Sequence, residues 1–164
     1  MIDELRKAAI QAALNIFETM FFTFLELVEA PKSPESSEGL PDETSDTFLL
    51  TEIPFKGDLD GALRLFLPFS LGESLAMNFL GFDDEVTEPQ LLDMASELSN
   101  MICGNLFSHY DKTAVYVLGS PITEKLSYSE ALTRLKNSDI DMEFETEGQK
   151  LTLQLHIVPN IEKG

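Results

Sequence analysis

Hydrophobic residues near the start of the chain recur at the spacing of an amphipathic helix. The residues are Leu5, Ala8, Ala9, Ala12, Ala13, Ile16 and Met20. Residues with this spacing lie along one face of a helix, so the pattern predicts a helix from Asp3 to about Phe22. Residues 21–28 favour an extended conformation, and the helix is expected to end among them.

The middle of the chain predicts a strand pair followed by a short helix. Phe48–Phe55 and Ala62–Leu67 are apolar runs of strand length, and residues 56–61 between them contain the glycines that a turn needs. A short helix is predicted over Leu71–Leu80. It should stop at Gly81, because glycine readily takes the left-handed conformation that follows a helix C-terminus.

A longer helix is predicted from Thr87 to about Ser108. It begins with a capping box, in which the side chains of Thr87 and Gln90 each accept a hydrogen bond from the other residue's backbone N–H. Pro89 lies in the first turn, where its missing N–H is not needed.

The last part of the chain indicates further strands and one short helix. Ala114–Leu118 and Ile140–Phe144 are strand candidates, and a helix candidate over Ser129–Lys136 lies between them. In the final strand, apolar residues at every second position of residues 151–157 alternate with polar ones. Glu147-Gly148 predicts the hairpin turn before it.

These elements predict an α+β fold in which two longer helices and a short helix pack on an antiparallel or mixed sheet. The order of the strands is left open. The 164 residues correspond to about one domain, so residues 1–164 are interpreted as a single domain. Residues 31–47 contain three prolines and a glycine among acidic and hydroxyl residues, which predicts an acidic, flexible loop.

Composition then excludes several functions. The 29 acidic residues outnumber 11 lysines and arginines, which gives a net charge of −18. This charge argues against binding to nucleic acid phosphates and to anionic membranes.

A single cysteine, Cys103, rules out an internal disulfide and a cysteine-based metal site. The acidic start of the chain does not resemble a secretory signal, and polar residues interrupt the apolar stretch 8–27, so a cytoplasmic protein is predicted.

The chemistry is predicted to lie on the helix that contains residues 91–105. At about 100° per residue, Asp93, Glu97, Asn100 and Gly104 fall within about 60° of one another. The opposite side is apolar and consists of Leu91, Ala95, Leu98, Ile102 and Leu106. Any amphipathic helix has a polar face, so this pattern alone leaves open whether the stripe is functional. A glycine inside a helix costs about 1 kcal/mol relative to alanine, which suggests that another molecule approaches the backbone at Gly104.

The spacing of Asp93, Glu97 and Asn100, followed after 20 intervening residues by Pro121, resembles the signature of the CheC/CheX/FliY family of chemotaxis phosphatases. The gap before Pro121 is slightly shorter than in the family pattern. Gly104 and the asparagine after it also match residues that commonly follow in family members. The order of the predicted elements is similar over most of the chain.

The resemblance is greatest to the one-site, CheX-like branch of this family. When the first helix is superposed on the motif helix so that Asn15 matches Asn100, Ala12 falls at the position of Glu97. The first helix therefore keeps an asparagine and lacks the acidic residue.

The resemblance implies that the chain hydrolyses the aspartyl phosphate of a CheY-like response regulator receiver domain. It implies that Asn100 positions the attacking water and that Glu97 pairs with a lysine of the receiver domain. Asp93, Gly104 and Pro121 take structural or orienting roles. No cofactor of the chain's own is implied, since the phosphorylated partner supplies Mg²⁺, and a homodimer is expected. The alternative is a non-catalytic module on the same fold that binds a response regulator or a flagellar switch component.

Other candidate groups have simpler interpretations. His109 follows the motif helix, where an imidazolium interacts favourably with the negative end of the helix dipole. Cys103 lies at the edge of the polar stripe and is predicted to be a packed thiol. His156 alternates with leucines and is predicted to lie on a solvated face of the final strand. The sequence has no glycine-rich phosphate loop and no carboxylates at metal-ligand spacing, so no metal site is predicted.

Overall fold

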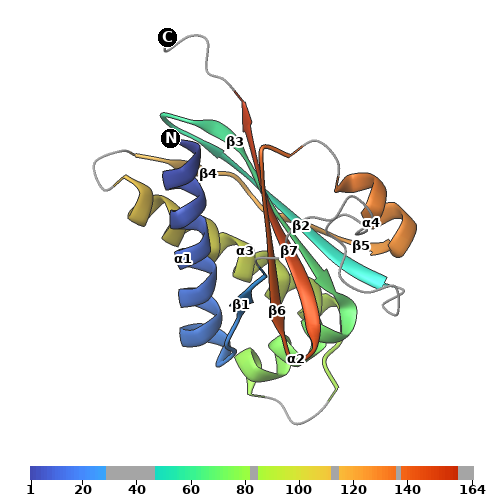
Figure 1. Ribbon diagram of the computed structural model, residues 1–164. Helices are drawn as coiled ribbons and strands as arrows, with labels where there is room; N and C mark the ends of the chain where they lie inside the picture. The colour runs from blue at the N-terminus through green and yellow to red at the C-terminus, as the bar shows by residue number, and fades with distance from the viewer. Residues whose placement is uncertain (29–46, 82–84, 112–114, 136–137, 159–164) are drawn as a thin grey trace.

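The computed structural model describes residues 1–28, 47–81, 85–111, 115–135 and 138–158 (Figure 1). Its helices are α1 (Ile2–Phe21), α2 (Phe69–Leu80), α3 (Glu88–Tyr110) and α4 (Tyr128–Arg134). Its strands are β1 (Glu26–Leu27), β2 (Thr47–Lys56), β3 (Asp60–Pro68), β4 (Val117–Leu118), β5 (Ile122–Ser127), β6 (Ile140–Thr146) and β7 (Gln149–Val158). The predicted α+β class is confirmed.

The strands form one sheet in the order β1-β6-β7-β3-β2-β4, with β5 also paired to β2. All of these pairs are antiparallel. β4 and β5 lie along the same edge of β2, where Leu118 is opposite Phe55 and Thr123 is opposite Thr51. The edge strand is therefore divided into two short segments, and Pro121 lies between them.

Helices α1, α2 and α3 lie on one side of the sheet, and α4 lies on the other (Figure 1). Because successive side chains of a strand point to opposite faces, the sheet contributes to a core on each side. The larger core contains Leu49 of β2 and the buried leucines of β3 and β7, together with the buried residues of α1, α2 and α3. The smaller core consists of Phe48, Leu50, Phe66, Leu126 and Ala131.

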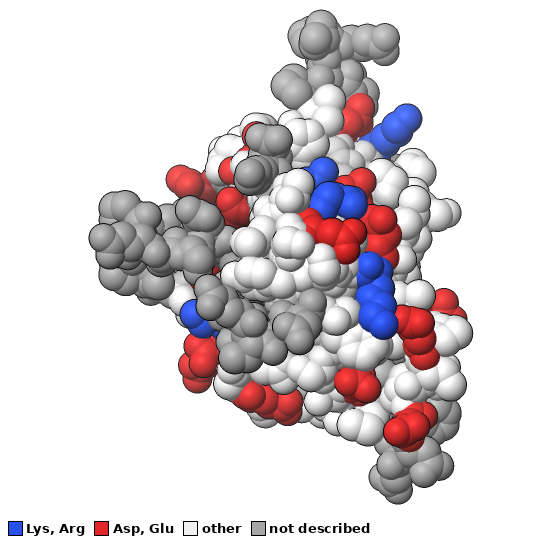
Figure 2. Space-filling view, turned by 90° about the vertical axis from the view of Figure 1, so that its right-hand side faces the viewer, with Lys and Arg blue, Asp and Glu red and all other residues white. Residues whose placement is uncertain are grey.

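Basic and acidic side chains lie side by side on the face that carries α4 (Figure 2). Arg64 Nε lies 2.6 Å from Glu52 Oε2, and Arg134 Nη2 lies 3.1 Å from Glu124 Oε2. These two arginines are therefore paired within the chain, across neighbouring elements.

The predicted helix boundaries agree closely with the structure. Both hydrogen bonds of the capping box form at the start of α3, at 2.9 Å from Thr87 N to Gln90 Oε1 and at 3.3 Å from Gln90 N to Thr87 Oγ1. α2 ends at Gly81 with φ 72°, the left-handed conformation that the sequence predicted. The hairpin turn before β7 is also confirmed, with positive φ at Glu147 and Gly148.

The strand predictions after α3 are less accurate. β5 was not predicted, and the candidate strand 114–118 is observed as the two-residue β4, with residue 114 outside the described ranges. Thr152 and Gln154, the polar residues that alternate with leucines in β7, are buried. Gln154 Nε2 donates to Leu135 O and to Asp141 Oδ1, each at 2.7 Å, so the chain beyond α4 covers this part of the sheet. Of the loop predicted at 31–47, residues 31–46 lie outside the described residues.

Candidate functional site

The structure places the polar stripe on the exposed side of α3. Asp93, Glu97 and Gly104 are exposed, and Asn100 is half-buried. The apolar residues predicted for the opposite side are all buried, namely Leu91, Ala95, Leu98, Ile102 and Leu106. The helix therefore presents these four residues to solvent while its other side holds it on the sheet.

The acidic and amide side chains of the stripe are available to a partner. Within the described part of the chain, Asp93, Glu97 and Asn100 have no side-chain hydrogen bond or ion pair. Glu97 and Asn100 lie three residues apart, so their Cβ atoms are neighbours on the helix surface at roughly 5–6 Å. Both functional groups can thus enter the same cleft of another protein.

Strand β5 fixes α3 beside the stripe. The Oγ of Ser96, the residue before Glu97, lies 2.6 Å from Thr123 Oγ1, and Thr123 Oγ1 lies 2.9 Å from Thr51 Oγ1. At the start of α3, Lys125 Nζ lies 3.1 Å from Glu88 Oε1. These hydroxyl and ionic contacts restrict rotation of the helix relative to the sheet. They were missed because β5 was not recognised from the sequence.

Pro121 lies on the segment that runs beside the stripe. Along this segment, Thr123 bonds to Ser96, while Leu118 lines the same groove as Gly104. The segment therefore runs antiparallel to α3, and Pro121 lies between these two contacts along the chain. The structure brings the motif helix and the segment of Pro121 together as neighbouring elements.

Gly104 is not required by the packing of this chain. Apart from its own helix backbone and chain neighbours, a Cβ added at Gly104 would have no heavy atom of the described residues within 4 Å, so alanine would fit there. A glycine within a helix nevertheless costs about 1 kcal/mol relative to alanine. The bare backbone at this position instead leaves room on the outside of the helix.

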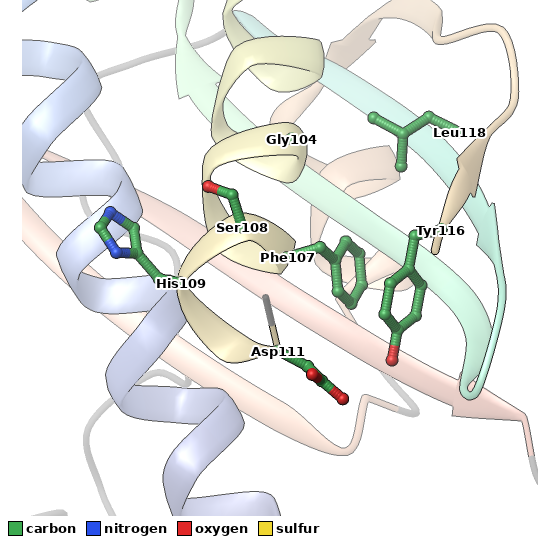
Figure 3. A pocket seen from close by; sticks show the side chains of 7 residues that line it. All are labelled: Gly104, Phe107, Ser108, His109, Asp111, Tyr116 and Leu118. Carbon is green, nitrogen blue, oxygen red and sulfur yellow. The ribbon is translucent and has the colours of Figure 1, made fainter. Parts of the chain in front are cut away.

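A groove of about 610 Å³ begins at Gly104 (Figure 3). One wall is made by the stacked rings of Phe107 and Tyr116, whose centroids are 3.9 Å apart. Leu118 also lines the groove, and Asp111 lies at the end of α3. Sequence reasoning did not find this groove, because its lining comes from two elements that only the folded chain brings together.

The remaining candidate groups do not form a metal or nucleophile site. Burial raises the pKa of the Cys103 thiol to about 12, so this thiol stays protonated, in agreement with its interpretation as a packed side chain. His109 is exposed in the last turn of α3, and His156 Nδ1 lies 3.3 Å from Asp139 Oδ2.

Among the residues that the structure describes, no group of three or more His, Cys, Asp or Glu side chains could hold a metal ion. None of the described helices is long and apolar enough to cross a membrane.

The first helix does not repeat the stripe. Ala8 and Ala12, which correspond to Asp93 and Glu97 when Asn15 is matched to Asn100, are both buried. These two positions of α1 therefore face the core, whereas the corresponding positions of α3 face solvent.

Comparison with known proteins gives a family match and a fold match. Residues 50–127 match the family model described as chemotaxis phosphatase CheX. The structure is similar to the chemotaxis protein CheX from Desulfovibrio desulfuricans, with a TM-score of 0.69, 14% identity, and 94% of this chain and 99% of that chain covered. No curated protein matched the sequence.

Two further solved structures have the same fold. The CheX–CheY–BeF3–Mg²⁺ complex from Borrelia burgdorferi matches with a TM-score of 0.65, 16% identity, and 93% of this chain and 97% of that chain covered. Thermotoga maritima FliY matches with a TM-score of 0.64, 16% identity, and coverage of 98% and 91%. The resemblance of the chain to the CheC/CheX/FliY family is thereby confirmed, by sequence over its central segment and by fold over nearly its whole length.

Proposed function

We propose that this CheX-like chain is a phosphatase that hydrolyses the aspartyl phosphate of a CheY-like response regulator receiver domain. The match to the CheX phosphatase family and the known CheX–CheY complex support this reaction and this class of partner. The observation that carries the proposal is that Glu97 and Asn100 project from one exposed helix face without partners among the described residues.

Asn100 is proposed to position the attacking water. Phosphoryl transfer to water needs positioning and charge stabilisation more than covalent chemistry from the protein. The Asn100 amide carries a carbonyl acceptor and an NH₂ donor, so it can orient one water through two hydrogen bonds. A water held about 3–3.5 Å from phosphorus, in line with the bond that breaks, is in a near-attack geometry.

Glu97 is proposed to pair with a lysine of the receiver domain. It lies about 4.5 Å before Asn100 along the helix axis, so one carboxylate contact would place the amide over the phosphoryl group. Asp93 lies one turn earlier and would help to orient the docked helix. Pro121 would shape the segment beside the motif. Mg²⁺ is expected to come from the partner.

The alternative is a non-catalytic module that binds a response regulator or a flagellar switch component through the same helix face. A docking surface would need the charge of Glu97 but not a water-positioning amide at Asn100. The homodimer implied by the family resemblance also stays a prediction, which light scattering during gel filtration would test.

The decisive experiment follows the decay of a phosphorylated CheY-type receiver domain with and without this protein. The wild-type chain should accelerate the decay, and Asn100→Ala should lose most of this acceleration, by about 100-fold, which is the loss expected when a reacting group is misplaced by about 1 Å. Asn15→Ala is the matched control, because Asn15 is an exposed asparagine on α1.

Unchanged decay in the presence of the wild-type chain would refute the phosphatase function for that receiver. Full activity of Asn100→Ala would refute the proposed mechanism. A variant that fails to hydrolyse but still binds the receiver domain would show that docking and chemistry are separable, as the proposed roles of Glu97 and Asn100 require.

A further inference from the structure

The groove beside α3 is continuous with the proposed catalytic face. Gly104 belongs to both, since it ends the polar stripe and lines the groove. It lies four residues after Asn100, about 6 Å along the helix axis. A receiver domain placed over Asn100 would therefore also lie over the mouth of this groove.

The walls of the groove suit an aliphatic chain, and its far end suits a positive charge. Leu118 and the stacked rings of Phe107 and Tyr116 provide the apolar wall (Figure 3). Asp111 lies at the C-terminal end of α3, where the helix dipole also favours a cation. Aromatic faces attract cations as well.

The electrostatic surroundings of Tyr116 agree with this description. Burial first, and then the negative charge of Asp58, raise the pKa of Tyr116 to about 12, with a smaller contribution from Asp111. Two carboxylates thus act on this end of the groove. His109 also lines the groove, with its imidazole ring directed toward α1 (Figure 3).

We propose that this groove binds a lysine or arginine side chain on the surface of the receiver domain, as a second anchor beside the catalytic contact. The aliphatic part of that side chain crosses α3 at Gly104 and packs against Leu118 and the ring of Tyr116, while its charge lies at Asp111. Long basic side chains bury their stems on apolar surfaces in this way. The inference rests on the proposed function, because it takes the receiver domain as the partner. This contact would explain why position 104 is a glycine, which the packing of the chain itself does not explain.

The test measures binding of a CheY-type receiver domain carrying Mg²⁺ and beryllofluoride, a stable mimic of the phosphorylated state. Asp111→Asn should raise the dissociation constant about two- to fivefold, the range for one exposed ion pair, and should weaken its dependence on salt. Gly104→Leu should raise the dissociation constant about tenfold, because an added side chain would fill the crossing point. Circular dichroism and thermal unfolding would show that both variants fold.

Two control variants make the same chemical changes elsewhere. Glu73→Gln removes one negative charge from the exposed side of α2, and Gln11→Leu adds apolar surface on the exposed side of α1. Neither should alter binding. If both groove variants bind as tightly as the wild-type chain, or if the controls weaken binding equally, the groove proposal is wrong.

The two proposals fail differently. The phosphatase proposal is judged by hydrolysis and by Asn100→Ala, whereas the groove is judged by binding alone. Loss of hydrolysis in Asn100→Ala with unchanged binding by Asp111→Asn and Gly104→Leu would overturn only the groove. If the wild-type chain hydrolyses the phosphate but does not bind the beryllofluoride form measurably, the second anchor is likewise refuted.

Discussion

Gly104→Ala should make the protein more stable while slowing the dephosphorylation that is proposed for it. Gly104 lies well inside α3, and beyond the backbone of that helix an added Cβ would meet no heavy atom of the described residues within 4 Å. Alanine is the better helix former by about 0.8–1.0 kcal/mol, mainly because glycine loses more backbone freedom on folding. The folded chain therefore gains this free energy with no steric penalty.

A gain of about 1 kcal/mol should raise the melting temperature by about 2–4 °C for a domain of this size. Thermal unfolding followed by circular dichroism would measure the shift, and urea unfolding would give the free energy. In the same preparation, receiver dephosphorylation should slow, because the methyl group stands where the partner approaches.

Other glycines provide matched controls for this argument. An added Cβ at Gly81 or Gly148 would likewise meet nothing within 4 Å among the residues that the structure describes, but their φ angles are +72° and +75°. Alanine at either position should therefore destabilise the protein by about 1 kcal/mol or more, since left-handed backbone is unfavourable for residues with a Cβ. A lower melting temperature for Gly104→Ala would refute the reasoning.

Three other predictions concern the core and the proposed contacts. Thr123→Val removes the hydroxyl that contacts Ser96 and Thr51, so the free energy of unfolding in urea should fall by about 1–2 kcal/mol, and Thr123→Ser should recover part of it. Burial raises the pKa of the Cys103 thiol from 9.0 to about 12. Burial also raises the pKa of the Tyr116 hydroxyl, from 10.0 to about 12. The folded state therefore holds the Cys103 thiol proton and the Tyr116 hydroxyl proton more tightly than the unfolded chain does. The stability that these two groups contribute is fully present below pH 9.0 and is lost as the pH rises toward 12. Urea unfolding midpoints measured across this pH range would check it. Glu97→Gln should keep the fold but weaken binding of the receiver domain, most clearly at low salt.

The sequence was sufficient to predict α3 and its polar stripe because both depend on local information. The capping box fixes where the helix begins, and a period of 3.6 residues then determines which side chains share a face. Glu97 and Asn100 follow from this periodicity, and so does the buried side of the helix. The family resemblance then supplied a chemical interpretation of residues that the periodicity had already placed together.

Strand β5 could not be predicted in the same way. Most of its residues are exposed and polar, and it becomes a strand by pairing with β2 from Thr47 to Glu52. The Thr123 contacts depend on that pairing, so they were missed as well. Burial of Gln154 has a similar origin, since alternation along β7 gives no indication that Leu135 will supply a hydrogen-bond acceptor from the chain beyond α4.

The break between β4 and β5 lies beside the proposed site, next to the strand and the contacts that the sequence did not predict. β4 pairs with Phe55 and the residue after it, and β5 pairs with residues 47–52. Pro121 lies in the gap between these two pairings, where its missing N–H does not remove a hydrogen bond between strands. Gly119 N donates to Pro54 O at 2.8 Å, and a Cβ at Gly119 would lie 2.5 Å from the Pro54 ring, so the chain crosses closely over β2 at this point. The two halves of the edge strand can then serve different purposes. Leu118 of β4 forms part of the groove, and β5 holds the helix that carries Asn100, so the break lets one edge of the sheet support both contacts proposed for the partner.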